Sequence, residues 1–276
     1  PVDRYGQVEP AAVAEAIGPH TTMAVIGYAN NEVGTIQPVA EIGAICRERG
    51  IRLYVDATQA AAALPLDVDA LQVDLLGISA HKIEGPKGVG ALFVRQGTNV
   101  IPQQVGGSQE RQRRAGTENV AGAVGLAAAL RLVRDDPAAM ATESDRQRVL
   151  RDGLLSRLQT IGDGQLTGHP TARLPNSVSW VFEGVEGGDL VAALDLDGLA
   201  VSTGSACTSG SAEPSHVLAA MGIPPERIRG SLRITLGRMT TASETEQAAD
   251  LVTAAVARIR AAAAVPRETS AAPAGA

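Results

Sequence analysis

Residues 77–90 read Gly-Ile-Ser-Ala-His-Lys-Ile-Glu-Gly-Pro-Lys-Gly-Val-Gly. An apolar run at 73–78 leads into them and predicts a buried strand, after which the chain turns through glycine and proline. A hydroxyl, an imidazole and an amine therefore come together where the strand ends. The amine belongs to Lys82, which we expect to be partly buried. Burial lowers the pKa of a lysine, and a neutral amine can form a Schiff base with an aldehyde cofactor. A surface lysine in a turn is the alternative.

The composition restricts the class of protein. The 276 residues suffice for one large domain or two of ordinary size. Hydrophobic residues make up 45% of the chain and aromatic residues 2%, so we expect a core of Ala, Val, Leu and Ile. A net charge of −6 without a basic stripe argues against a nucleic-acid partner. No signal peptide or membrane-spanning run is recognised, which argues against a membrane protein. Two cysteines make no disulfide framework and favour the cytoplasm.

Strands and helices are expected to alternate along the first part of the chain. We predict strands at 22–29, 51–55 and 73–78, a helix at 39–49, and a short helical or irregular crossing at 57–72. This alternation predicts an α/β fold with a parallel sheet. Ligands of such sheets bind beyond the carboxyl ends of the strands. Asn31, Asp56 and the pair His81-Lys82 all fall there, which predicts a binding site.

The remaining elements suggest a second domain. A strand at 89–95 follows a tight turn and is expected to be antiparallel. Further on we predict helices at 118–134, 141–159, 188–196 and 243–263, and strands at 176–182, 199–202 and 232–236. We expect a cofactor-binding large domain at 1–132 and a small domain at 133–264 that carries a cysteine loop. A tail rich in Pro, Ala and Ser at 265–276 is expected to be disordered.

Asp56 ends an apolar strand, so we expect its carboxylate to be partly buried and to need a cationic partner. A protonated pyridine nitrogen is such a partner, and an acidic residue beside it lets a pyridoxal ring act as an electron sink. A helix N-cap or an ordinary strand-end aspartate is the alternative. Asn31, Gln59, Ser79 and His81 can supply neutral hydrogen bonds to a cofactor's phenolic oxygen and phosphate, although each is also an ordinary loop residue.

Cys207 lies in a loop rich in glycine and serine, where little side-chain bulk surrounds it. Exposure permits ionisation, and the thiolate is the nucleophilic form. An incidental free thiol is the alternative. Cys46 lies in the helix predicted at 39–49 and is expected to be an inert core thiol. Arg233 lies in a predicted strand and can bind a substrate carboxylate with two hydrogen bonds, or else form a surface ion pair.

Five motifs follow one another along nearly the whole chain short of the tail. They are Asn-Asn-Glu-Val-Gly at 30–34, Val-Asp-Ala-Thr-Gln at 55–59, Ser-Ala-His-Lys-Ile-Glu-Gly-Pro-Lys-Gly at 79–88, Arg-Ala-Gly-Thr-Glu-Asn at 114–119 and Gly-Ser-Ala-Cys-Thr-Ser-Gly at 204–210. Together they resemble the motifs of cysteine desulfurases of the NifS/IscS type, within the pyridoxal-phosphate-dependent class V aminotransferases. The resemblance implies fold type I of these transferases, with a partial large domain and a smaller C-terminal α/β domain.

The resemblance also implies how pyridoxal 5'-phosphate is bound. Lys82 would form the Schiff base, and Asp56 would pair with the pyridinium nitrogen. The neutral contacts would come from Asn31 and Gln59 to the phenolic oxygen, and from Ser79 and His81 to the phosphate. Thr117 would reach the phosphate bound to a neighbouring subunit, which implies a homodimer.

By the same resemblance the substrate is L-cysteine, held by Arg233 and Asn31. The thiolate of Cys207 would attack the substrate sulfur, keep it as a persulfide and release L-alanine, while Lys82 moves the α-proton. The sulfur would pass to an iron–sulfur cluster scaffold or a sulfur-relay protein. Cys207 would also be a transient iron–sulfur ligand shared with that scaffold.

Members of this family extend roughly another third of their length before the position of Pro1, so we expect the chain to be N-terminally incomplete. That stretch holds a phosphate loop and a histidine that stacks on the cofactor ring. His20, His169 and His216 do not match this histidine by motif, and Glu84 stands where an aromatic residue is common. Two alternative functions stay open: a selenocysteine lyase, and an inactive remnant that serves as an interaction module.

Overall fold

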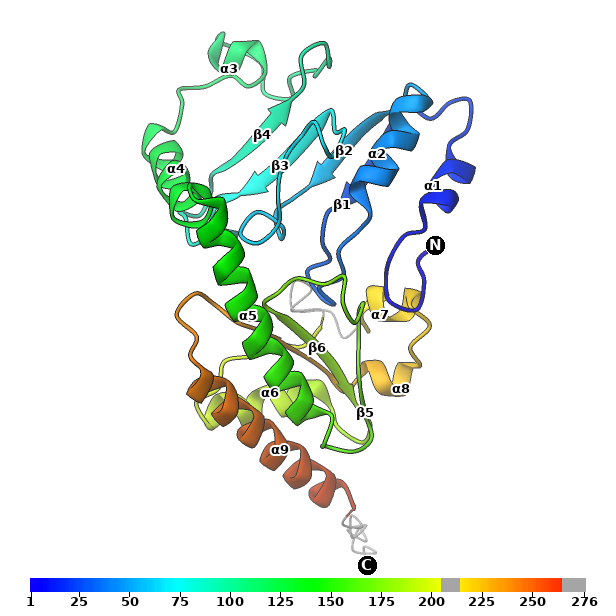
Figure 1. Ribbon diagram of the computed structural model, residues 1–276, viewed down its shortest axis with the longest axis vertical. Coiled ribbons are helices and arrows are strands. Elements are labelled where there is room, and N and C mark those ends of the chain that lie inside the picture. The colour runs from blue at the N-terminus through cyan, green and yellow to red at the C-terminus, as the bar shows by residue number, and fades with distance from the viewer. Residues whose placement is uncertain (205–213, 265–276) are drawn as a thin grey trace, which may run out of the picture. The chain divides into compact units, whose positions relative to one another are not determined.

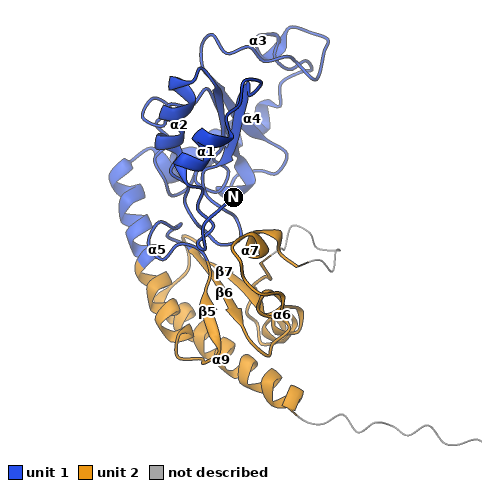
Figure 2. Cartoon of the chain, turned by 90° about the vertical axis from the view of Figure 1, so that its right-hand side faces the viewer, with its two compact units in different colours: residues 1–148, 168–176 blue, residues 149–167, 177–276 orange. Residues whose placement is uncertain are grey.

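The computed structural model describes residues 1–204 and 214–264 of the chain. They form two compact units (Figure 2). The first comprises Pro1–Arg148 and Gly168–Asn176, and the second Val149–Thr167 and the chain from Ser177 onward. The two compact units divide later in the chain than the domain boundary that we expect between residues 132 and 133. That domain boundary stays a prediction. The tail expected to be disordered, 265–276, lies outside the described residues.

The first unit is built on a four-stranded sheet with the strand order β1-β2-β3-β4 (Figure 1). Its strands are β1 (Met23–Gly27), β2 (Arg52–Asp56), β3 (Leu75–Ser79) and β4 (Gly90–Val94). The first three are parallel, and β4 is antiparallel to β3. Each strand overlaps the range predicted for it. The predicted α/β class and the antiparallel fourth strand are therefore confirmed.

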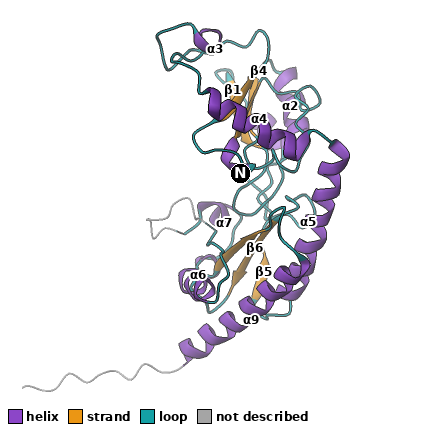
Figure 3. Ribbon diagram, turned by 90° about the vertical axis from the view of Figure 1, so that its left-hand side faces the viewer, coloured by secondary structure: helices purple, strands orange, loops and turns teal. Residues whose placement is uncertain are grey.

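Helices lie along the chain before, between and after these strands (Figure 3). They are α1 (Pro10–Ala16), α2 (Val39–Glu48), the 3-10 helix η1 (Ala80–Lys82), α3 (Gln109–Gln112), α4 (Val120–Arg134) and α5 (Pro137–Leu158). Residues 57–72 form turns, so the irregular alternative for this crossing is the observed one. The pattern did not predict α1, which begins at Pro10, a residue suited to the first helical position.

The two faces of the four-stranded sheet differ. Leu53 and Val55 are buried in a core that they share with α2. Because strand side chains alternate, Tyr54 and Asp56 lie on the opposite face. Their register partners there include Val25 of β1, which is 66% exposed. Asp56 is therefore exposed, even though its neighbours Val55 and Ala57 are buried.

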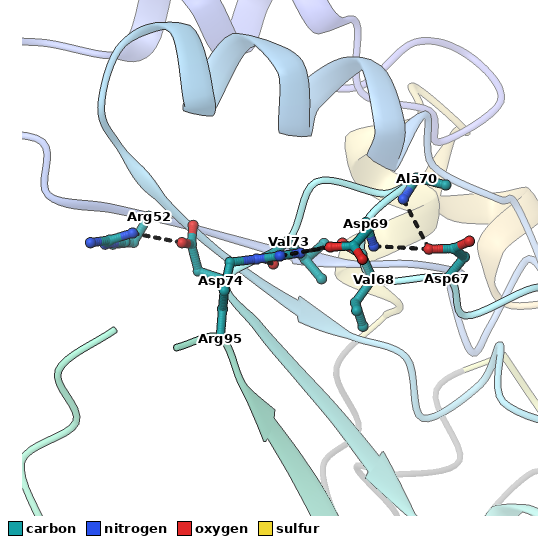
Figure 4. A network of polar contacts seen from close by, with 8 residues as sticks. All are labelled: Arg52, Asp67, Val68, Asp69, Ala70, Val73, Asp74 and Arg95. Carbon is teal, nitrogen blue, oxygen red and sulfur yellow. Dashed lines mark hydrogen bonds and ion pairs between the residues drawn. The ribbon is translucent and has the colours of Figure 1, made fainter. Parts of the chain in front are cut away.

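A polar network holds the other end of the sheet, where β2 and β3 begin (Figure 4). The carboxylate of Asp74 accepts hydrogen bonds from the backbone N–H of Leu53 at 2.9 Å and from Arg52 at 2.7 Å. The guanidinium of Arg95 donates to the carbonyl of Val73 at 2.8 Å. The polar groups at this end thus bond to the backbone and to each other.

The second unit contains a three-stranded antiparallel sheet with the order β5-β6-β7. Its elements are β5 (Gly164–Leu166), β6 (Ser177–Phe182), α6 (Gly187–Leu196), α7 (His216–Ala220), α8 (Pro225–Ile228), β7 (Ser231–Thr235) and α9 (Ala242–Ala264). The strand predicted at 199–202 is wrong, because these residues make only a single bridge, between Ser202 and Arg233. Within the described ranges, no helix combines the length and the apolar character needed to cross a membrane.

Candidate functional site

Three parallel strands end together at one edge of the first unit's sheet. Gly27, Asp56 and Gly77 are register partners across β1, β2 and β3. Asp56 is the last residue of β2 and Ser79 the last of β3, and Lys82 ends the 3-10 helix that follows. The structure therefore places the carboxylate and the amine beyond the carboxyl ends of adjacent strands. This is where ligands of parallel sheets bind.

The carboxylate of Asp56 is only partly engaged. Its Oδ1 accepts a hydrogen bond from the backbone N–H of Thr58 at 2.9 Å, the contact of an Asx turn. Its backbone carbonyl accepts the N–H of Tyr28 at 2.8 Å, so the residue is well anchored. The expectation of partial burial is wrong, because the side chain lies on the exposed face. Among the described residues, none donates to Oδ2, which can accept a hydrogen bond from a ligand.

Lys82 is also exposed, so the expectation that it is partly buried is wrong. The reason is the geometry of η1: Ala80 and Ile83 face the core at 0% and 2% exposure, and His81 and Lys82 project outward. The carbonyl of Ala80 accepts the N–H groups of Ile83 and Gly85, each at 2.9 Å, which fixes the turn. Nζ of Lys82 forms no hydrogen bond or ion pair with the part of the chain that the structure describes. A rigid turn thus presents an accessible amine.

The other predicted residues are distributed over both units. Asn31 lies half-buried in the loop after β1, and Gln59 lies half-buried in the turn after β2. Thr117 is exposed in the first unit, in the loop before α4. Arg233 is half-buried in β7 of the second unit. Cys207 lies outside the described residues.

Tyr54 is a residue of this region that the sequence reasoning missed. A Cβ on Gly77 would lie 2.6 Å from its hydroxyl oxygen, so the phenol covers the glycine that pairs with Asp56. Burial raises the pKa of Tyr54, and the negative charge of Asp56 raises it further. The phenol therefore stays a neutral hydrogen-bond donor at physiological pH. The signal was the strand alternation, which places Tyr54 and Asp56 on one face.

The donor set at this edge fits pyridoxal 5'-phosphate. A carboxylate suits a protonated pyridine nitrogen, and a primary amine suits an aldehyde. The hydroxyl of Ser79 and the ring of His81 suit a phosphate group. Of the two lysines in the whole chain, Lys82 and Lys87, Lys82 is the one that directly follows β3. No cluster of three or more His, Cys, Asp or Glu residues that could hold a metal is found in the described ranges.

The Asp56→Asn variant is expected to bind pyridoxal 5'-phosphate about 10- to 100-fold more weakly. A hydrogen bond to a charged group contributes about 1.5–3 kcal/mol, and the amide removes the charge that pairs with the pyridinium. Titration followed by the cofactor's absorbance measures the affinity. Asp69→Asn is the matched control, because Asp69 is an exposed aspartate at the other end of the sheet. Equal affinities of wild type and Asp56→Asn would refute the pyridinium pairing.

Comparison with known proteins identifies the family. The Aminotransferase class-V family matches residues 1–247. "Cysteine desulfurase IscS" of Methanosarcina thermophila is 48% identical, over 94% of this chain and 64% of the relative. "Cysteine desulfurase IscS" of Dictyoglomus turgidum is 45% identical, over 94% of this chain and 66% of the relative. The chain thus spans less than two thirds of the length of these curated relatives.

Solved structures agree with this assignment. A structure titled "NIFS-LIKE PROTEIN" has a TM-score of 0.85 and 33% identity, and the match covers 94% of this chain and 67% of the other. A NifS-like protein from Rickettsia africae has a TM-score of 0.82 and 28% identity, with 94% and 68% covered. The predicted fold type I is confirmed by these structures. Pyridoxal 5'-phosphate is the cofactor of the proteins of this class, as the resemblance implied. The chain belongs to the class-V aminotransferase family.

Proposed function

We propose that the protein is a pyridoxal-phosphate-dependent cysteine desulfurase, which takes the sulfur from L-cysteine and releases L-alanine. The observation that carries this proposal is the pair formed by Asp56 and Lys82, which lie beyond the ends of adjacent parallel strands. The relatives named cysteine desulfurase support the substrate. The proposal concerns the activity of the whole protein, because this chain spans less than two thirds of the length of these relatives.

The roles of the residues at the sheet edge follow from their chemistry. When bound, pyridoxal 5'-phosphate supplies an electron sink for the α-carbon of an amino acid. The carboxylate of Asp56 keeps the ring nitrogen protonated. Ser79 and His81 hold the phosphate, and Asn31 and Gln59 give neutral hydrogen bonds to the phenolic oxygen. These assignments are part of the proposal.

Lys82 and two residues of the second unit act on the substrate. The amine of Lys82 would hold the aldehyde of the cofactor and would move the α-proton of the substrate, and its exposed position on a hydrogen-bonded turn suits both roles. The guanidinium of Arg233, together with Asn31, binds the carboxylate of L-cysteine. The thiolate of Cys207 attacks the substrate sulfur: an S–S bond forms while the C–S bond breaks. The electron pair of the broken bond stays on the substrate carbon, which takes a proton as L-alanine forms.

The proposal extends to partners and location. The persulfide on Cys207 passes its sulfur to an iron–sulfur scaffold or a sulfur-relay protein, and Cys207 is then a transient iron–sulfur ligand shared with the scaffold. The protein acts as a cytoplasmic homodimer in which Thr117 reaches the cofactor phosphate of the partner subunit. The exposure of Thr117 in its loop supports this contact.

A turnover assay tests the proposed function. The purified protein is incubated with pyridoxal 5'-phosphate, L-cysteine and a thiol reductant, and sulfide and alanine are measured together. We expect equal amounts of both products, because each C–S bond broken yields one of each. A protein that neither turns yellow with the cofactor nor forms alanine would be the inactive remnant. Faster turnover of L-selenocysteine would instead identify a selenocysteine lyase.

A further inference from the structure

The loop that carries Asn31 is closed by hydrogen bonds within itself. The N–H of Asn30 donates to the carbonyl of Thr35 at 2.9 Å, and the N–H of Gly34 donates to the carbonyl of Asn30 at 3.0 Å. The side-chain Oδ1 of Asn30 accepts the N–H of Val33 at 3.0 Å. Asn31 follows Asn30 inside this closed loop. Its backbone position therefore depends on where Asn30 and Thr35 are held.

A segment that is distant in the sequence forms hydrogen bonds with this loop. Residues 168–176 belong to the first unit, although they lie between β5 and β6 in the chain (Figure 2). Three hydrogen bonds join them to the loop. Nη2 of Arg173 donates to the carbonyl of Val33 at 3.0 Å, and the N–H of Leu174 donates to the carbonyl of Gly34 at 2.9 Å. In the other direction, the N–H of Ile36 donates to the carbonyl of Ala172 at 2.9 Å. At Gly168 (φ +84°) a Cβ would lie 2.3 Å from the carbonyl oxygen of Val33. The approach is close enough to require glycine.

One side-chain hydroxyl joins three segments of the chain at this point. Thr35 is 0% exposed. Its Oγ1 donates to the carbonyl of Tyr5 at 2.6 Å and accepts the backbone N–H of His169 at 2.9 Å. His169 is held in turn, because its Nδ1 accepts the N–H of Ala172 at 2.8 Å. The hydroxyl therefore ties the amino-terminal segment and the 168–176 segment to the Asn31 loop.

We propose that Thr35 is a positioning residue for Asn31. A valine at this position keeps the shape but removes the buried hydroxyl that accepts the N–H of His169 and donates to the carbonyl of Tyr5. Buried polar groups without partners are strongly unfavourable, so the three segments should separate there and admit water. The loop would then open, and Asn31 would lose its fixed place beside the sheet edge. The consequence for the cofactor rests on the proposed function; the consequence for the loop does not.

Hydrogen exchange and cofactor binding test this role. Thr35→Val is compared with Thr35→Ser, which restores the hydroxyl and is therefore the matched control. We expect Thr35→Val to raise amide exchange in a peptide covering residues 28–37 by about tenfold or more, with exchange in β2 unchanged. Affinity for pyridoxal 5'-phosphate, followed by absorbance, is expected to fall in the same variant. Thr35→Ser should return both values close to those of the wild type.

Each outcome decides a separate point. Unchanged exchange at residues 28–37 in a folded Thr35→Val protein would overturn the proposal. Faster exchange with undiminished cofactor affinity would also overturn it, because the loop would then not position Asn31 for the cofactor. If the wild type binds no cofactor, the proposed function fails, and the exchange data still decide whether Thr35 holds the loop. If Thr35→Val does not fold, Thr35→Cys replaces it, since a thiol is a weak donor and should give an intermediate effect.

Discussion

The Cys207→Ala variant is expected to lose sulfide release from L-cysteine by at least about 10³-fold, because removing a nucleophile leaves only the contributions of binding and electrostatics. Cofactor binding should stay at the wild-type level, since the proposed contacts to pyridoxal 5'-phosphate come from other residues. Sulfide and bound cofactor are measured on the same sample. Wild-type sulfide release by the variant would remove Cys207 from its proposed role.

Cys46 provides the matched control for this experiment, because it is the other of the two cysteines in the chain. It is a residue of α2 whose side chain is 1% exposed in the core of the first unit. Burial raises the pKa of its thiol, and the negative charge of Asp74 raises the pKa further. A raised pKa means less thiolate at a given pH, so Cys46 should resist alkylation at pH 8 until the protein unfolds. Cys46→Ala should accordingly release sulfide at nearly the wild-type rate.

The second large effect is expected for Lys82→Ala, which should neither form alanine from L-cysteine nor retain the cofactor after borohydride reduction. Borohydride fixes pyridoxal 5'-phosphate only where an amine has condensed with the aldehyde. The chain contains two lysines, Lys82 and Lys87, so a reduced adduct on a side-chain amine has two possible positions. Mass spectrometry of the digested protein is therefore expected to find the adduct on Lys82.

Lys87→Ala is the matched control, because Lys87 is exposed and lies five residues further on in the same glycine-rich stretch. It should keep both the adduct and the alanine product. An adduct on Lys87 in the wild type would move the Schiff base to the other lysine. An adduct that survives in Lys82→Ala at wild-type yield would contradict the assignment in the same way.

Much of the fold could be predicted because its strands and long helices have strong local patterns. The run that contains β2 is apolar on one face and ends in an aspartate, and this pattern predicted both the strand and its last residue. The antiparallel β4 followed from the tight turn after Lys82. By contrast, α1 and β5 are short elements of 7 and 3 residues, too short for a periodic pattern to stand out. The strand predicted at 199–202 had a suitable composition but pairs only at Ser202.

The exposure of the site residues could not be inferred in the same way. Alternation along the apolar run places Asp56 on the face opposite Leu53 and Val55, but it does not say whether other layers cover that second face. Asp56 lies on the face where Val25 is exposed, and η1 turns Lys82 outward. The proposed chemistry of the pair depends on residue type and on the strand ends, which the pattern did predict. The degree of burial depends on the surrounding layers.

The amino-acid sequence by itself determined the family and the α/β class. It also determined the carboxylate and the amine that follow adjacent strands. Each of these can be recognised from a local run of residues. Tertiary structure alone decided how the Asn31 loop is held. Thr35 and His169 are 134 positions apart, and the hydrogen bond between them joins a side chain to a backbone amide. A local pattern carries no information on such a pair, since the two groups meet only when the chain returns from β5 to the first unit.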